Sequence, residues 1–185
     1  MATMIKDVRF LSRESRTSEA GRSLKKFLVA VDDSEYALRA VRYVGSVLCN
    51  MQDTSVTLFH VLKPMPRELL EHGGSENPAE EVRLTRDLQR EQENWVREES
   101  AKQLPILGRA AEWLQRSGFP RERVTLKFGH EDNIARSILD EARTGGFGTI
   151  VVSRHGANSK RRFLGAGIMD ELLRTAAGVT LWVVD

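Results

Sequence analysis

The sequence contains one cysteine, Cys49, among its 185 residues, so no disulfide can form within the chain. Such sparing use of cysteine is typical of proteins kept in a reducing cytoplasm, and we expect that location here. No segment approaches the ~18 consecutive apolar residues that a membrane-spanning helix needs, and the first residues lack the apolar stretch of a signal peptide. The sequence therefore predicts neither a membrane protein nor a disulfide-held secreted one.

An excess of charge of one sign is also missing, because 28 Lys and Arg residues face 26 Asp and Glu residues, a net charge of +2. Proteins that coat nucleic acid carry a large basic excess, so this balance argues against that class. Apolar residues make up 41% of the chain, which is enough for a packed core. We therefore expect one soluble domain that binds neither nucleic acid nor membrane.

Residues 1–24 are rich in Ser, Thr and Arg and are expected to form a flexible or loosely docked tail. The rest of the chain alternates short apolar segments with amphipathic ones. The expected strands are residues 25–31, 55–62, 123–128, 149–153 and 179–185. The expected helices begin at Ser34, near residue 80, at Glu131 or Asp132, and near Ile168. The second of them extends to about residue 115, and Pro105 is expected to break or kink it.

This alternation predicts an α/β fold, in which βαβ units form a parallel sheet with helices on both faces. Right-handed crossovers then give a three-layer, doubly wound sandwich. In such folds ligands bind outside the carboxyl ends of the strands, where the strand order reverses. That rule selects three places: Asp32 after the first strand, Val61 near the end of the second, and the loop after the fourth.

The loop from Ser153 to Met169 carries four Lys or Arg residues, three glycines and no acidic residue, and it leads into the last expected helix. Free backbone N–H groups, a helix dipole and positive charge together suit a phosphate. The alternative is an ordinary connecting loop with a solvated basic face. Asp32 also has two interpretations: it can accept hydrogen bonds from a ribose or an adenine amino group, or it can cap the following helix.

Familiar catalytic signatures are missing from the sequence. It has no Walker A motif and no GxSxG elbow, and Asp170 stands where a dinucleotide-binding fingerprint needs its third glycine. The four histidines lack metal-ligand spacing. Only His155 lies in the candidate loop, whereas His60 is expected in the core or at the rim of the sheet. We therefore assign no catalytic and no metal-binding residue.

Four segments, in this order, resemble the universal stress protein family: KKFLVAVDDSEYALRAVRYV, VTLFHVLKP, FGHEDNIARSILDEA and TIVVSRHGANSKRRFLGAGIMDELLRTAAGVTLWVVD. The resemblance covers residues 25–185 as one universal stress protein domain. It implies a Rossmann-like fold of the adenine nucleotide alpha hydrolase type, with five strands in the order 3-2-1-4-5. It also implies a stress-response regulatory or binding module that forms a homodimer through its last strand, residues 179–185.

Nucleotide-binding members of this family hold ATP with a loop of Gly, two residues, Gly, nine residues, Gly and then Ser or Thr. Here Ser153 replaces the first glycine, only eight residues separate Gly156 from Gly165, and Ala166 removes the hydroxyl. One lost hydrogen bond to a charged phosphate is expected to weaken binding by about 1.5–3 kcal/mol. The resemblance thus implies a degenerate site for ATP or AMP, with or without magnesium. Asp32 and Val61 would hold the nucleoside, and the phosphates would meet Arg154, His155, Gly156, Gly165, Ala166 and Gly167.

Two other functions stay open. One is an enzyme of the same architecture that slowly hydrolyses ATP or transfers its adenylyl group, for which the loop supplies only His155. The other is a ligand-free interaction module for a regulatory protein partner, which would use the charged helical region 80–115 and residues 1–24. Nucleotide found in the purified protein would distinguish binding from the second alternative.

Overall fold

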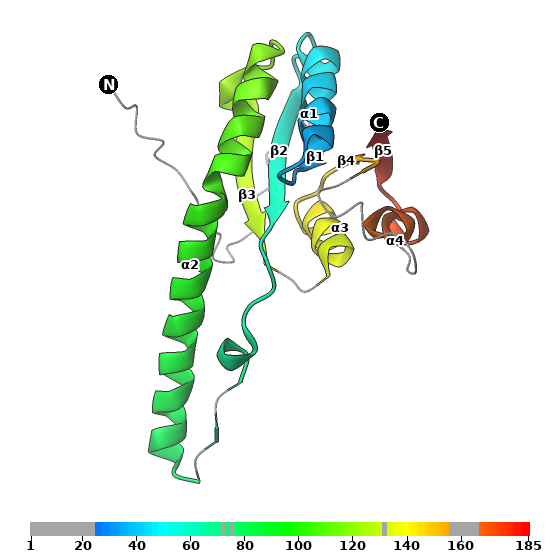
Figure 1. Cartoon of the computed structure of the whole chain (residues 1–185). Coiled ribbons are helices and arrows are strands. Elements are labelled where there is room, and N and C mark those ends of the chain that lie inside the picture. Colours follow the sequence, from blue (N-terminus) through cyan, green and yellow to red (C-terminus); the bar gives the residue numbers. More distant parts are fainter. Residues whose placement is uncertain (1–24, 72, 75, 131–132, 156–166) are drawn as a thin grey trace, which may run out of the picture.

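The computed structural model describes residues 25–71, 73–74, 76–130, 133–155 and 167–185 (Figure 1). Five parallel strands form one sheet in the order β3-β2-β1-β4-β5, as predicted. The strands are β1 (Lys25–Ala30), β2 (Thr54–Val61), β3 (Val124–Gly129), β4 (Thr149–Ser153) and β5 (Thr180–Val184). Their ends agree with the sequence-based expectation to within one residue. The expected tail, residues 1–24, lies outside the described residues.

The helices cover both faces of this sheet and make three layers (Figure 1). One face packs against α1 (Glu35–Leu48) and α2 (Pro78–Arg116), and the other against α3 (Ile134–Thr144) and α4 (Ile168–Thr175). Two short 3-10 helices, η1 (Arg67–Leu69) and η2 (Arg121–Arg123), lie in the connections before α2 and β3. In the described part of the chain, no helix combines the length and the apolarity needed to cross a membrane.

Strand β1 shows why the strands of the sheet can be predicted from the sequence. Val29 packs with α1 and α2, whereas Leu28 packs with α3 and α4, and both side chains are fully buried. Because successive side chains of a strand point to opposite faces, a central strand covered on both sides must be apolar throughout. The continuous apolar run therefore predicts a buried parallel strand.

The structure confirms one expected helix start and corrects another. Ser34 caps α1 by accepting a hydrogen bond from the Ala37 backbone N–H at 3.1 Å, and of the two interpretations of Asp32 the capping one does not apply. Helix α3 begins at Ile134 rather than at Glu131 or Asp132, and its cap is Asn133. Asn133 caps α3 by accepting a hydrogen bond from the Arg136 backbone N–H at 2.9 Å, and its amide group also donates to Glu171.

Helix α2 continues through Pro105, so the expected break does not occur. The proline costs the helix one backbone hydrogen bond, but Leu107, Ala110 and Leu114 beyond it are fully buried and hold the helix to the sheet. None of residues 78–98 in the other half is buried, and this half extends away from the sheet beside the β2–α2 connection (Figure 1). The Gln92 side chain donates to the Leu69 carbonyl at 2.6 Å and joins the two.

Candidate functional site

A cavity of about 610 Å³ lies at the carboxyl ends of β1, β2 and β4. Strand β1 pairs with β2 on one side and β4 on the other, so the strand order reverses at this point. Doubly wound sheets bind their ligands at such a reversal. The volume is within the roughly 300–1,000 Å³ typical of small-molecule sites. The cavity is therefore the candidate functional site.

Five of the eight predicted binding residues line this one cavity: Asp32, Val61, Arg154, His155 and Gly167. They come from the ends of β1, β2 and β4 and from the start of α4. The other three, Gly156, Gly165 and Ala166, lie outside the described residues. The topology thus brings together those predicted residues that the structure describes.

Much of the wall on the α3 and α4 side is apolar. Phe59, Ile138 and Leu172 line the cavity there and are almost completely buried. On the opposite side, α2 contributes Gln103 and Ile106. An apolar wall with a few polar groups suits a flat aromatic ring that carries polar substituents.

Polar contacts at the rim of β1 fix two adjacent carboxylates. The Ser34 hydroxyl, 9% exposed as a residue, donates to Asp32 Oδ1 at 2.5 Å. Asp33 also lines the cavity and forms an ion pair with Arg109 of α2. Two carboxylates therefore lie at the rim of β1, and the ion pair of the second one with Arg109 connects this rim to α2.

His60 at the end of β2 presents a defined tautomer to the cavity. Its Nδ1 lies 2.7 Å from the Val31 carbonyl oxygen, and a carbonyl can only accept, so Nδ1 carries the proton. The neutral ring then has Nε2 as an acceptor. Phe128 packs edge-on against it, with ring centroids 6.1 Å apart. His60 thus lies at the rim of the sheet, one of the two places expected for it.

The basic groups after β4 share a carboxylate with each other. Arg154 Nη1 lies 3.5 Å and His155 Nδ1 3.6 Å from the Asp185 carboxylate. The His155 ring also packs on Tyr36, with centroids 5.1 Å apart. Its Nδ1 is buried and has no hydrogen-bond partner among the described residues. Part of the positive charge predicted for a phosphate is therefore balanced within the protein.

At the start of α4, one of the backbone amides that the sequence predicts to be free is occupied. The Gly167 backbone N–H donates to Asp170 Oδ2 at 3.0 Å, so this amide is occupied. Asp170 and Glu171 both lie in the first turn, where carboxylates interact favourably with the helix dipole. The protein itself thus supplies anions at the place expected to attract a phosphate.

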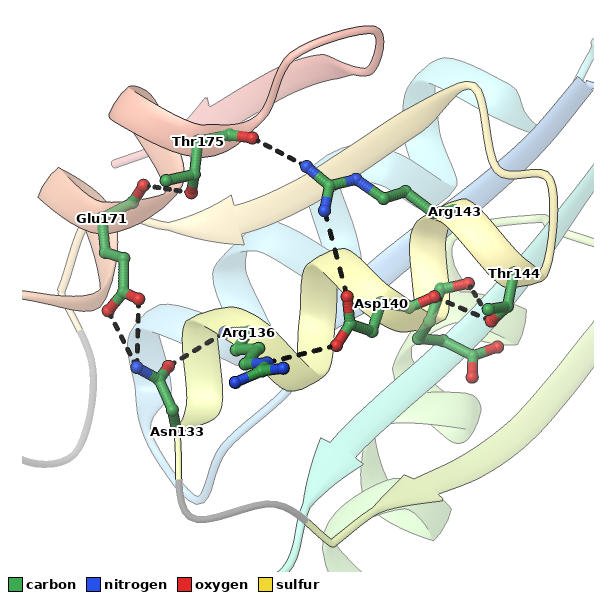
Figure 2. A network of polar contacts seen from close by, with 8 residues as sticks. Asn133, Arg136, Asp140, Arg143, Thr144, Glu171 and Thr175 are labelled. Atoms are coloured by element: carbon green, nitrogen blue, oxygen red, sulfur yellow. Dashed lines mark hydrogen bonds and ion pairs between the residues drawn. The ribbon is translucent and has the colours of Figure 1, made fainter.

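A polar network holds α4 against α3 (Figure 2). The Asn133 amide donates to both Glu171 carboxylate oxygens, at 3.0 and 3.2 Å. At the other end of the helices, Arg143 donates to the Thr175 carbonyl at 3.1 Å. These contacts fix the orientation of α4 and therefore of Gly167 and Met169, which line the cavity.

Sequence reasoning missed the wall that α2 provides. Gln103 and Ile106 belong to a helix that follows β2, and their helical spacing indicates only a packed face. It also missed Asp33, whose ion pair with Arg109 spans 76 positions of the chain. A charged residue directly after a strand was the only available signal for Asp33.

Comparison with known proteins places the fold in a family. A family model described as "Universal stress protein family" matches residues 23–184. The universal stress protein UspA from Lactobacillus plantarum is 17% identical with a TM-score of 0.58, and the match covers 89% of this chain and 100% of that one. No curated protein sequence matches the chain significantly.

Two similar structures are described with nucleotides. A universal stress protein from Archaeoglobus fulgidus in complex with dAMP is 16% identical with a TM-score of 0.52, covering 88% of this chain and 99% of that one. A family protein from Arabidopsis thaliana with AMP bound is 18% identical with a TM-score of 0.52, covering 86% and 90%. At such identities the likeness concerns the fold.

Proposed function

Because the chain belongs to the universal stress protein family, we propose that it is a cytoplasmic stress-response regulatory module that binds an adenine nucleotide, AMP or ATP, in this cavity. The observation that carries the proposal is the meeting of Asp32, Val61, Arg154, His155 and Gly167 around one cavity of about 610 Å³. The AMP and dAMP complexes of similarly folded proteins support the choice of ligand.

The nucleoside would lie between the ends of β1 and β2. Asp32 offers a carboxylate that can accept a hydrogen bond from a ribose hydroxyl, as acidic residues do in related nucleotide sites. The apolar wall around Phe59 and Ile138 would cover the base. The phosphate would then point toward Arg154 and Gly167, on the β4 side. Magnesium, where it takes part, would enter bound to the phosphates of the nucleotide.

The direct test is mass spectrometry of any nucleotide released from purified, denatured protein, followed by calorimetric titration with AMP and ATP to millimolar concentration. We expect saturable binding that Asp32→Ala weakens. Asp53→Ala is the matched control, because Asp53 is exposed and directly precedes β2 at the opposite end of the sheet. If neither nucleotide binds saturably, the proposal fails. A ligand-free module is then favoured, with the projecting residues 78–98 as the surface for a regulatory protein partner.

We also propose a homodimer formed through β5. This strand is at the edge of the sheet, and an unpaired edge exposes backbone groups that readily join another strand. Val183 is 40% exposed, and Trp182 and Val184 beside it are half-buried. Pairing with a second copy about a two-fold axis would cover them. Light scattering should give a dimer mass for the wild type and for Leu173→Lys on exposed α4, but a monomer for Val183→Lys.

A further inference from the structure

We propose that His60 selects the base of the bound nucleotide. Its Nε2 atom accepts a hydrogen bond from the amino group of adenine, so the cavity takes a 6-aminopurine in preference to a 6-oxopurine such as hypoxanthine. This role rests on the proposed function, because it names a residue that recognises the ligand of the same cavity. It concerns the base, which the proposed function places at the ends of β1 and β2.

The hydrogen-bonding capacity of His60 is fixed by its neighbours. Its Nδ1 lies 2.7 Å from the Val31 carbonyl oxygen, which can only accept, so the proton of the neutral ring is on Nδ1. Phe128 packs edge-on against the ring, with centroids 6.1 Å apart, and limits its rotation. The Nε2 atom of the neutral ring is therefore an acceptor that is held in one direction.

This acceptor can be reached from the cavity. His60 lines the cavity and is half-buried. No described residue hydrogen-bonds its Nε2, and yet this atom is not sealed inside the protein, because the described residues show a buried unpartnered side-chain atom only at His155 Nδ1. A ligand that covers Nε2 must supply a hydrogen-bond donor, or the site loses the hydrogen bond that water makes with an open acceptor.

The place of His60 on β2 suits contact with the edge of a base. Successive side chains of a strand point to opposite faces. Phe59 therefore belongs to the apolar wall on the α3 side, whereas His60 packs with Phe128 on the side of α1 and α2. Both Phe59 and His60 line the cavity. A base between them can place its ring face on the apolar wall and its polar edge at His60.

Gln103 of α2 adds a second acceptor to the cavity. Its Nε2 donates to Glu99 Oε1 at 3.0 Å, and a carboxylate can only accept, so this bond fixes which end of the amide is the nitrogen. Its Oε1 has no hydrogen-bond partner among the described residues. The amino group of adenine brings two N–H donors, whereas the 6-oxo group of hypoxanthine brings lone pairs toward acceptors.

One lining cation favours the opposite choice. Lys63 follows β2 and is exposed, and its ammonium group can donate to a 6-oxo oxygen. Its long flexible side chain must be ordered to do so, whereas the His60 ring is already held by two contacts. We therefore expect the fixed acceptor to determine the choice of base, and the test includes Lys63.

The test is calorimetric titration of the full chain with adenosine, with purine riboside, which lacks the amino group, and with inosine, which carries the oxo group. The three 5′-monophosphates form a second series. Only the base changes within each series, so the comparison does not depend on the phosphate. We expect the adenine compound to bind about tenfold more tightly than the purine compound and about 100-fold more tightly than the hypoxanthine compound.

His60→Asn is the decisive variant, because its amide nitrogen can keep the bond to Val31 while the Nε2 acceptor is lost. In this variant the three bases should bind within about threefold of one another. A purely structural role of His60 would lower all three affinities together and keep their ratios. His130→Asn, at an exposed histidine directly after β3, is the matched control and should keep the wild-type affinities. If His60→Asn does not fold, the wild-type series decides.

The outcomes separate this role from the proposed function. If no adenine compound binds, the proposed function fails and the role of His60 fails with it. If the adenine compound binds no more tightly than the purine compound, the function stands and His60 does not select the base. If the hypoxanthine compound binds most tightly and Lys63→Met abolishes that preference, Lys63 recognises the base instead. A preference for adenine that survives in His60→Asn assigns the amino group to another acceptor and overturns the role of His60.

Discussion

Replacing Gly45 with alanine should destabilise the protein, although the same change inside a helix usually stabilises one. Gly45 lies in α1 and is buried where this helix meets the end of α2. A Cβ atom there would lie 2.6 Å from Ser117 Cβ and 3.2 Å from the Leu114 carbonyl oxygen. Atoms at 2.6 Å overlap, and one of the contacts is backbone, so the helices must separate to accept the methyl group.

Two opposing effects set the size of the change. Alanine gains about 1 kcal/mol over glycine in a helix interior. Overpacking a close contact costs typically about 1–3 kcal/mol. The 2.6 Å approach and the fully buried Leu114 place this case toward the upper end of the cost. We therefore expect Gly45→Ala to lower the free energy of unfolding by about 1–2 kcal/mol.

Gly108 in α2 provides the matched control, because a Cβ atom built there meets nothing within 4 Å. Gly108→Ala should raise the free energy of unfolding by up to about 1 kcal/mol. Urea unfolding followed by circular dichroism measures both, and an unchanged dependence on urea makes the midpoints comparable. The reasoning is refuted if Gly45→Ala is as stable as Gly108→Ala, because α1 and α2 would then not be in close contact.

Three further predictions concern the elements around the cavity. Ser34→Ala should lower the free energy of unfolding by about 1 kcal/mol, measured by thermal unfolding, because α1 loses its cap. Ser34→Thr should keep most of this stability, and an alanine variant as stable as the wild type would contradict the capping role. Leu172→Ala should lower the free energy of unfolding by about 2–5 kcal/mol, measured by urea unfolding, because this fully buried side chain joins α4 to the core. A decrease below about 1 kcal/mol would mean that α4 is loosely attached. Asn133→Asp keeps the cap of α3 but faces Glu171 with a second carboxylate, so amide hydrogen exchange in residues 168–175 should become faster than in the wild type; unchanged exchange would show that the contact does not hold α4.

The strands of the sheet could be predicted from the sequence because each of them is a short apolar segment. Leu28 and Val29 must both be apolar, since helices cover both faces of β1. The course of α2 could not be read in this way. Pro105 predicts a break, and only the burial of Leu107 and Leu114 farther along explains why the helix continues. Tertiary packing outweighs a local preference there, and packing partners are distant in sequence.

The position of the candidate site was predictable, because the topology rule locates it from the order of strands and helices alone. Its wall from α2 and the ion pair between Asp33 and Arg109 were not, because no local pattern records a contact across 76 positions. Asn133 illustrates the same limit, since its contact with Glu171 is 38 positions away.

The charges around the candidate site could not be predicted from one segment of the sequence. Residues 153–169 contain four cations and no acid, which predicts an attractive place for several phosphates. The carboxylate of Asp170, the next residue, accepts a hydrogen bond from the Gly167 backbone N–H. The carboxylate of Asp185, the residue after β5, lies near Arg154 and His155. A ligand meets the charges that surround it in space, and these include acids from outside the window. The Arg154 guanidinium, one of the four cations in that window, therefore faces a carboxylate that the window does not contain.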